Sequence, residues 1–347
     1  MGQKINLITT RMPNHARHSG YDRLIDYIDA QQIISLEDWT FFSRALAKLF
    51  KSQIKQSDLQ WYHRDNFISE FKAAKRWIAG KHQVFHFLYG ENSYRYLGNL
   101  KSLNRKNSII GTYHTPPDRF KEVVRTDKHL YQLDAIITMS RMQNDFFSKY
   151  VGQDRTFFIP HGIDVDYFKP AEKVEEKEGP IKCLFVGSHL RDIDTLVDAS
   201  LLLAQWGEKC EIVAVTSPEN KAKIEKSNNI TLRTGINDEE LLQLYQQSDL
   251  LLFPLLAATA NNSLLEAMAC GLPIVSTDLE GVRDYVNEEA AILVKRKDAK
   301  ALADAVVQLS EDTKLRVSMG LASREQAMKL SWQSVAKQIH DIYKLVQ

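Results

Sequence analysis

Short apolar runs separated by longer amphipathic stretches form the hydrophobic pattern of this chain. The clearest example begins with the unbroken apolar run Leu250 to Phe253, which stops at Pro254 and is typical of a strand buried on both faces. A small polar loop follows, then helical spacing over Ser263 to Cys270, then the β-branched run Ile274 to Thr277. This order predicts a helix N-terminus beyond the carboxyl end of a strand, a position that favours anions.

The same alternation extends over both halves of the chain. Further strands are predicted at Ile5–Thr10, Val84–Leu88, Ser108–Thr112, Ala135–Met139, Phe157–Pro160, Ile181–Val186, Glu211–Val215 and Ile230–Arg233. Helical patterns cover Tyr21–Ala30, Ser35–Ala79, Ile193–Gln205, Asn237–Ser248 and Ser331–Val346. Strands that alternate with helices imply parallel sheets whose loops gather at one edge. The predicted fold class is α/β, with two doubly wound, Rossmann-like domains.

A charged segment without aromatic residues, Ala171 to Pro180, separates the two sets of strands. Its composition is typical of a linker, and 347 residues are enough for two cores. We therefore predict a first domain at 1–170 and a second at 171–347. The C-terminal helix, 331–347, is expected either to stay with the second domain or to pack back on the first.

Composition argues against several classes of protein. Lys plus Arg number 45 against 44 Asp plus Glu, so no global field favours nucleic acid. Three scattered cysteines are too few for a disulfide framework, which indicates a reducing compartment. The N-terminus lacks the apolar core of a signal peptide, and nowhere do about 18 apolar residues run together. We expect a cytoplasmic protein.

One segment departs from the overall balance of positive and negative side chains. Between Arg44 and Trp77 there are eight Lys or Arg and three Asp or Glu, interleaved with aromatic residues. Such a face suits an anionic membrane surface, and peripheral contact with the inner face of the membrane is one interpretation. A solvated helix face is the other.

Candidate site residues lie at the predicted strand ends. His114 follows one strand and precedes a Pro-Pro stop, and Gly20 lies between the first strand and a helix, where a phosphate could approach the backbone. Ser263 and Glu266 have the spacing of a capping box. His15 and His18 could ligate a metal on spacing alone, although solvation in a loop is the favoured interpretation.

Three segments together resemble the retaining GT-B-fold glycosyltransferases of family 4. They are LDAIITMSRMQNDF at 133–146, IPHGIDVDYFKP at 159–170 and LLEAMACGLPIVSTDLEGVRDYV at 264–286. The resemblance implies two Rossmann-like domains facing a cleft. It also implies transfer of a hexose from a nucleoside diphosphate sugar to a hydroxyl acceptor with retention of configuration. No metal or further cofactor would be needed. The cationic segment between Arg44 and Trp77, not the resemblance, suggests an acceptor that is lipid-linked or part of a cell-envelope glycan.

The resemblance also assigns roles by position. Glu266 matches the carboxylate that contacts the ribose hydroxyls, and His114 matches a histidine placed against the donor sugar at the reaction centre. The remaining donor-binding positions are Gly20, Gly187, Arg191, Gly235, Ile236, Asn261, Asn262, Ser263 and Leu264. Arg191 falls near the family's diphosphate-binding lysine, while the arginine usual after the glycine is replaced by Ser188. The base, the donor sugar and the acceptor are not readable from these positions.

The largest departure from the family pattern is Ala258. Eight positions before Glu266, most members carry a second glutamate, and this chain has no carboxylate between Pro254 and Asn262. Asn261, Asn262 and the backbone would then contact the donor sugar in an active enzyme. The alternative is a nucleotide-sugar-binding scaffold with little turnover.

Overall fold

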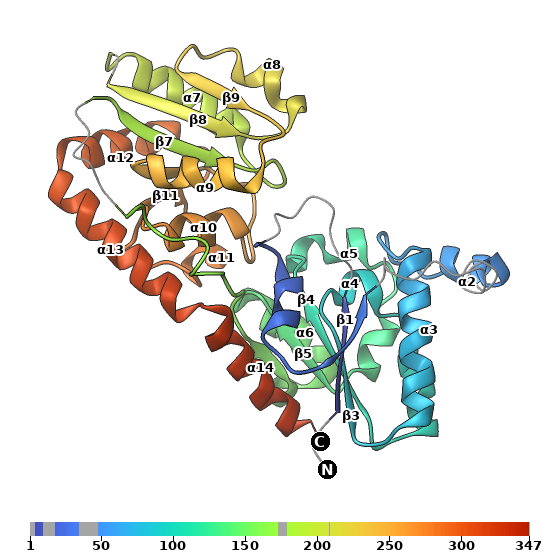
Figure 1. Ribbon diagram of the computed structural model, residues 1–347. Coiled ribbons are helices and arrows are strands. Elements are labelled where there is room, and N and C mark those ends of the chain that lie inside the picture. Colours follow the sequence, from blue (N-terminus) through green and yellow to red (C-terminus); the bar gives the residue numbers. More distant parts are fainter. Residues whose placement is uncertain (1–3, 10–17, 35–47, 173–178, 208, 347) are drawn as a thin grey trace. The chain divides into compact units, whose positions relative to one another are not determined.

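A computed structural model describes residues 1–347 except 1–3, 10–17, 35–47, 173–178, 208 and 347. The chain divides into two compact units, each with its own hydrophobic core. The first unit comprises residues 1–15, 20–162 and 332–347, and the second comprises residues 16–19 and 163–331. Figure 1 labels the elements of both units.

The first unit is built on a six-stranded sheet in the order β2-β1-β3-β4-β5-β6, with every neighbouring pair parallel. Its strands are β1 (Lys4–Thr9), β2 (Gln31–Ile34), β3 (Gln83–Phe87), β4 (Ser108–Tyr113), β5 (Ala135–Thr138) and β6 (Thr156–Phe158). Its α-helices are α2 (Lys51–Lys55), α3 (Arg64–Ala79), α4 (Gly90–Ser93), α5 (Phe120–Val123), α6 (Met142–Val151) and α14 (Trp332–Leu345). Short 3-10 turns are η1 (Tyr21–Asp26), η2 (Leu97–Leu103), η3 (Pro117–Arg119), η4 (Lys128–Gln132) and η5 (Gln153–Arg155).

The second unit has a second six-stranded parallel sheet, in the order β12-β11-β10-β7-β8-β9. Its strands are β7 (Ile181–Val186), β8 (Cys210–Val215), β9 (Ile230–Arg233), β10 (Leu250–Phe253), β11 (Ile274–Thr277) and β12 (Ala291–Val294). Its helices are α7 (Ile193–Ala204), η6 (Pro218–Asn220), α8 (Lys221–Ile224), α9 (Asp238–Gln247), α10 (Asn262–Ala269), α11 (Glu280–Arg283), α12 (Ala299–Glu311) and α13 (Thr313–Lys329). The prediction of two Rossmann-like α/β domains is confirmed.

Both sheets follow from the apolar runs. β3, β4, β5, β10 and β11 are buried along their whole length, as strands covered by helices on both faces must be. β3 contains one ionisable side chain, His86. Its Nε2 is hydrogen-bonded to the Thr112 hydroxyl and its Nδ1 to the Tyr343 hydroxyl of α14, both at 2.7 Å. These contacts fix the C-terminal helix to the sheet of the first unit.

The boundary between the units differs from the predicted one. Residues 163–170 belong to the second unit, because the Ile163 amide donates to the Leu330 carbonyl and the Arg324 guanidinium binds the carbonyls of Val165 and Phe168. The predicted linker therefore falls within the residue range of the second unit, and its residues 173–178 lie outside the described part. Residues 332–347 belong to the first unit.

The sequence did not predict the edge strands β2 and β12, which are short. The predicted helix Tyr21–Ala30 is only the 3-10 turn η1. Within the predicted helix Ser35–Ala79, α2 and α3 are separated by a turn at Asp58, whose φ is 60°, and by Leu59, which bridges to Val124. A residue with left-handed φ cannot continue a right-handed helix. Residues 35–47 of that prediction lie outside the described residues.

Candidate functional site

The N-terminus of α10 lies where β10 ends, next to the position where the second sheet reverses its strand order between β10 and β7. Asn261 caps the helix, and its Oδ1 accepts the Ser263 amide at 3.1 Å. The predicted capping box of Ser263 with Glu266 is wrong, because the helix begins at Asn262 and Asn261 takes the capping position. This leaves the Glu266 carboxylate available for other partners.

Arg191 supplies a fixed cation at this helix terminus. Its Nη2 donates to Asn261 Oδ1 at 3.2 Å and to Ser263 Oγ at 3.3 Å, while Nε donates to the Val186 carbonyl at 2.8 Å. The guanidinium also lies over the Phe253 ring, 4.4 Å from its centroid. Burial lowers the pKa of Arg191 to about 10, so the side chain stays protonated at neutral pH. Cation and helix dipole together favour a negatively charged ligand.

Glu266 is the buried carboxylate of this region, with 3% of its surface exposed. Its Oε1 accepts the Ser19 hydroxyl, and its Oε2 accepts the Tyr245 hydroxyl at 2.8 Å. Burial raises the pKa of Glu266, while these two hydrogen bonds oppose the shift. The carboxylate thus already binds two hydroxyl donors, which is the same kind of partner that a ribose diol offers.

The loops after neighbouring strands complete this edge of the sheet. Gly187 follows β7 with φ of 100°, and a Cβ there would lie 2.6 Å from Arg191 Nη2. Gly235 follows β9 with φ of 64° and is exposed, while Ile236 is partly exposed. Because β7, β9 and β10 are parallel strands of one sheet, their carboxyl ends lie along one edge.

The structure therefore brings most predicted donor-binding residues together in the second unit. They are Gly187, Arg191, Gly235, Ile236, Asn261, Asn262, Ser263, Leu264 and Glu266. We call the part formed by Arg191, Asn261, Ser263, Glu266 and Tyr245 the α10 corner. Ala258 lies in the preceding loop and is 7% exposed.

Gly20 and His114 belong to the first unit. Gly20 precedes η1 with φ of 99°, and His114 follows β4. The His114 imidazole stacks on Tyr89, with ring centroids 4.8 Å apart, and meets the edge of Tyr21 at 5.1 Å. Its main-chain amide donates to Glu91 Oε1 at 2.9 Å. We call the group Tyr21, Tyr89, Glu91 and His114 the His114 corner.

Several residues of these corners were not found from the sequence. Tyr245 lies on the amphipathic helix α9, where a buried aromatic residue gives no sign that its hydroxyl binds a carboxylate. Ser19 precedes Gly20, and nothing in the local sequence indicated that its hydroxyl binds a carboxylate. Glu91 follows β3, and the strand-end rule that selected His114 could have selected it as well.

Metal ligation by His15 and His18, the less favoured interpretation of their spacing, gains no support. His15 lies outside the described residues, and the His18 Nδ1 is 3.0 Å from Asp164 Oδ2 while its ring stacks on Tyr167 at 3.6 Å. No group of three or more His, Cys, Asp or Glu side chains in the described part of the chain is placed to hold a metal ion. The cysteines Cys183, Cys210 and Cys270 are free and buried. Within the same described residues, no helix has the length and apolar character to cross a bilayer.

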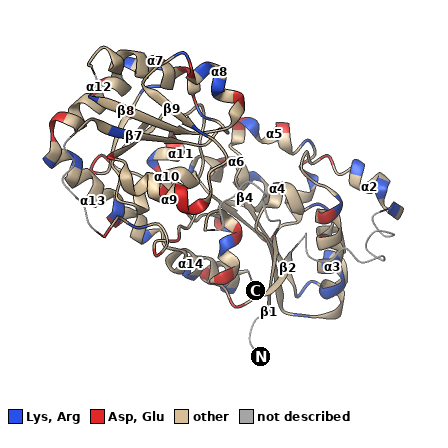
Figure 2. Ribbon diagram, turned by 45° about the horizontal axis from the view of Figure 1, so that its top comes forward, with Lys and Arg blue, Asp and Glu red and all other residues tan. Residues whose placement is uncertain are grey.

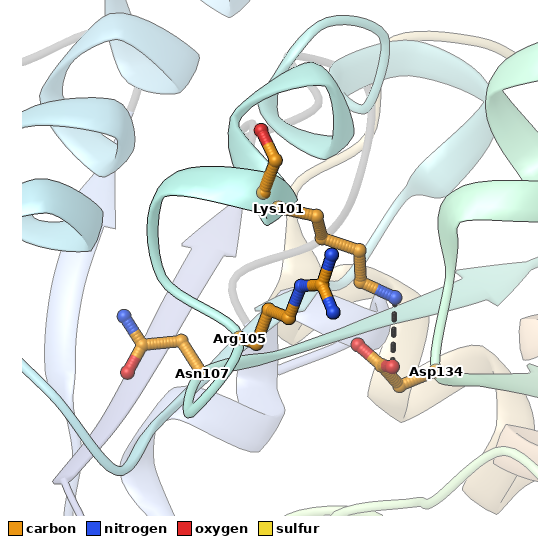
Figure 3. Close-up of a pocket in the computed structure, with 5 residues that line it drawn as sticks. Lys101, Arg105, Asn107 and Asp134 are labelled. Carbon is orange, nitrogen blue, oxygen red and sulfur yellow. Dashed lines mark hydrogen bonds and ion pairs between the residues drawn. The ribbon is translucent and has the colours of Figure 1, made fainter.

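A separate pocket of about 350 Å³ lies in the first unit, lined by Lys101, Ser102, Arg105, Asn107 and Asp134 (Figure 3). Lys101 Nζ is 2.7 Å from Asp134 Oδ1. The pocket lies where β4 and β5 begin, which is the opposite edge of the sheet from His114. It therefore contributes nothing to either corner.

A family model matches part of the second unit. This model, of the glycosyl transferases group 1, matches residues 180–312, which contain the whole α10 corner. That range of the chain is therefore similar to the group 1 glycosyl transferases. A D-inositol 3-phosphate glycosyltransferase of Corynebacterium urealyticum is 36% identical to this chain over 111 residues, 30% of this chain and 25% of the relative.

Solved structures extend the likeness in fold to nearly the whole chain. Sucrose-phosphate synthase of Thermosynechococcus elongatus has a TM-score of 0.70 at 19% identity, covering 99% of both chains. Anabaena HepE in complex with UDP-glucose has a TM-score of 0.68 at 15% identity, covering 99% of this chain and 100% of that one. The fold is therefore GT-B. The chain spans only 25% to 62% of the length of the first curated relatives that it matches.

Proposed function

We propose that this protein transfers a hexose from a nucleoside diphosphate sugar to a hydroxyl acceptor with retention of anomeric configuration. The observation that carries the proposal is the α10 corner, where a partly buried guanidinium and the N-terminus of α10 lie within the same unit as a buried carboxylate. A diphosphate matches the first two groups by charge, and a ribose diol matches the third by hydrogen bonding.

The proposed reaction depends more on the positioning of the donor and the acceptor than on a strong base. The bond between the anomeric carbon and the diphosphate oxygen breaks, and a bond from the acceptor oxygen to the same carbon forms on the same face. The acceptor's proton passes to the departing diphosphate oxygen. Arg191 and the α10 amides stabilise the charge that develops on the diphosphate. We propose that no metal ion or additional cofactor takes part.

His114 is the residue that we propose at the reaction centre, against the donor sugar. Its side chain is 19% exposed, lies at the carboxyl end of β4 and contacts the aromatic rings of Tyr21 and Tyr89. Aromatic faces suit the apolar C–H surfaces of a hexose, and the imidazole offers a hydrogen bond to a hydroxyl.

A nucleotide-sugar-binding scaffold with little turnover is the second candidate. Ala258 favours it, because no carboxylate stands in the loop 255–261. Ser19 and Tyr245 occupy both oxygens of Glu266, which bears on the two candidates alike, since both must bind the ribose. A bound ribose would have to displace the Ser19 hydroxyl or share the carboxylate with it.

Measurements of nucleotide binding and of turnover with purified protein distinguish the two candidate functions. A thermal-shift screen of UDP, GDP, ADP and their glucose or mannose conjugates identifies the nucleotide, because a ligand of the folded state raises its apparent stability. Donor hydrolysis and transfer to a panel of hydroxyl acceptors are then measured with that nucleotide sugar. Turnover with retention supports the transferase. Nucleotide binding without turnover supports the scaffold, and absence of binding contradicts both.

We further propose a cytoplasmic protein that contacts an anionic membrane peripherally and acts on a lipid-linked or cell-envelope acceptor in glycan biosynthesis. The support is a cluster on the first unit: Lys51 and Lys55 are exposed on α2, Leu49 is 75% exposed and Trp61 is 38% exposed. Figure 2 shows basic residues along α2 and α3. Cations beside exposed apolar side chains suit an anionic lipid surface.

Flotation with vesicles containing phosphatidylglycerol tests this contact. Binding at low salt that weakens at high salt is expected, and Lys51→Glu with Lys55→Glu should reduce it. Lys300→Glu on α12 of the second unit is the matched charge control and should leave binding unchanged. Lack of binding at low salt would contradict the membrane contact without affecting the transferase proposal.

A further inference from the structure

Glu91 brings a second functional group to the His114 corner. β3 and β4 are parallel neighbours, with Phe87 opposite Gly111 in the register. α4 begins soon after β3, so Glu91 lies beside the point where β4 ends and His114 follows. The carboxylate and the imidazole therefore share the edge of the sheet at which ligands of α/β proteins bind.

One oxygen of Glu91 holds His114. Its Oε1 accepts the His114 main-chain amide at 2.9 Å and the Thr115 hydroxyl at 3.3 Å, and it lies 3.5 Å from His114 Nδ1. Only 3% of the Glu91 side chain is exposed. The same oxygen thus constrains both the backbone and the imidazole of His114.

The other oxygen of Glu91 is buried and has no hydrogen-bond partner among the residues that the structure describes. Burying a carboxylate oxygen without a donor is costly, and most buried polar atoms have partners. The ion pairs of the described residues place no lysine or arginine on Glu91. The missing partner is therefore a hydrogen-bond donor that does not come from the described protein.

Glu70 shows what a purely structural carboxylate looks like in the same unit. It is also 3% exposed, but its Oε1 accepts the amides of Arg95, Tyr96 and Leu97, and its Oε2 accepts the Tyr62 hydroxyl. Both oxygens of Glu70 are satisfied inside the fold. Glu91 has the same burial with only one oxygen satisfied, which separates it from a structural role.

The groups around Glu91 suit a neutral polyol. The imidazole that Glu91 contacts is stacked on Tyr89 and meets Tyr21 edge-on. A carboxylate oxygen that accepts a hydroxyl, next to aromatic faces that cover C–H groups, is a favourable combination for a sugar ring. A sugar hydroxyl would satisfy the unpaired oxygen without adding charge.

We propose that Glu91 positions His114 through Oε1 and accepts a sugar hydroxyl through Oε2. The hydroxyl belongs either to the transferred hexose or to the acceptor. This inference rests on the proposed transferase function, and it adds a carboxylate to the site independently of the loop that contains Ala258.

Glu91→Gln and Glu70→Gln form the matched test. The Glu91→Gln enzyme should bind UDP or the nucleotide found in the thermal-shift screen as wild type does, with a kcat about 100-fold lower, because a small misplacement of reacting groups has an effect of this size. A rise in KM for the nucleotide sugar would assign the hydroxyl to the donor, and a rise in KM for the acceptor would assign it to the acceptor. Glu70→Gln should lower the melting temperature and leave the kcat of the folded enzyme near the wild-type value.

Wild-type kcat and KM values in Glu91→Gln would overturn the proposal. It would also be overturned if Glu91→Gln lost activity only in proportion to unfolded protein, as a structural residue would. If wild type shows no turnover, the proposed function fails separately, and saturation-transfer NMR with D-glucose and myo-inositol in the presence of the nucleotide decides the present inference. Binding to wild type that is lost in Glu91→Gln supports it, and equal or absent binding overturns it.

Discussion

The α10 corner and the His114 corner occupy equivalent places in two sheets of the same kind, yet their polar groups are satisfied differently. In the α10 corner, Arg191 is held by acceptors of the protein, and both oxygens of Glu266 have hydroxyl donors. In the His114 corner, one oxygen of Glu91 is bonded, and the other has no partner among the described residues.

The difference shows how each corner is prepared for its ligand. A dianionic diphosphate needs a cation and helix amides that are fixed before it arrives, and four hydrogen bonds fix Arg191. A neutral sugar needs acceptors and apolar faces, which the rings and the carboxylate of the His114 corner provide. The comparison predicts that variants of the two corners affect separate steps, binding of the nucleotide and transfer of the sugar.

The largest expected effect comes from Arg191→Ala. Removing this partly buried cation should weaken binding of the nucleoside diphosphate about 100-fold, equivalent to about 3 kcal/mol for a hydrogen bond to a charged group. The free nucleoside should bind as before, because it carries no phosphate. Isothermal titration calorimetry with both ligands measures the difference. Equal losses for nucleoside and diphosphate would show that Arg191 only supports the fold.

Glu266→Gln should have the next largest effect. The amide keeps the size of the side chain but replaces one acceptor oxygen by a donor, so nucleotide affinity should fall about 30-fold, or about 2 kcal/mol. The 2′-deoxy nucleotide should bind wild type and variant with similar affinity if the carboxylate accepts the ribose hydroxyls. Unchanged affinity of the ribonucleotide would contradict the ribose role.

A third prediction concerns His86, a buried residue of β3 in the same unit as the His114 corner. Burial lowers the pKa of His86 to about 3, below the value of about 6.5 for an exposed histidine. Between these values the unfolded chain binds the proton and the folded chain does not, so His86 makes stability fall as the pH drops below about 6.5.

The measurement is the free energy of unfolding at pH 7.5 and pH 5 from chemical denaturation. Wild type should lose about 2 kcal/mol more than His86→Gln over this interval. Gln does not titrate, and it can still bond Thr112 and Tyr343. Equal losses in the two proteins would show that His86 does not control the acid response.

The smallest expected effect is that of Tyr245→Phe. The change removes one hydroxyl from Glu266 Oε2 and leaves Ser19 on the other oxygen. Nucleotide affinity should fall about fivefold, or about 1 kcal/mol, because the ribose carboxylate is less well oriented. Tyr343→Phe, which loses a buried tyrosine hydroxyl in the first unit, is the control and should leave nucleotide affinity unchanged.

Prediction from sequence was most accurate where apolar runs are long. β7, β9, β10 and β11 have the predicted bounds, and β10 and β11 consist of apolar or small residues and are buried along their whole length. The edge strands β2 and β12 were missed: β2 begins with two exposed glutamines, and β12, although apolar, is a four-residue run that is only partly buried. The long helix over Ser35–Ala79 failed at Asp58 and Leu59, where pairing with Val124 overrides local helical spacing.

In the candidate site, local sequence identified the residues that follow strands and begin helices. It selected Ser263, Glu266 and His114, whose positions depend on chain order in a parallel sheet, while Arg191 was assigned only through the resemblance to the family. It misassigned the cap, because Asn261 and Ser263 are both good capping residues and only the helix start selects between them.

The sequence by itself determined the alternation of strands and helices and the two doubly wound units, since these follow from periodicity and from the residues that end apolar runs. It placed the start of the helix that follows β10 at Ser263, one residue after the start that the structure shows. Only the tertiary structure decided the partners of the buried carboxylates. Glu266 meets Ser19 and Tyr245 from distant segments, while Glu91 bonds His114 through one oxygen and finds no partner for the other in the described part of the chain. Hydrogen bonds between residues far apart in the chain depend on how the strands are ordered in the sheet, which no local pattern encodes.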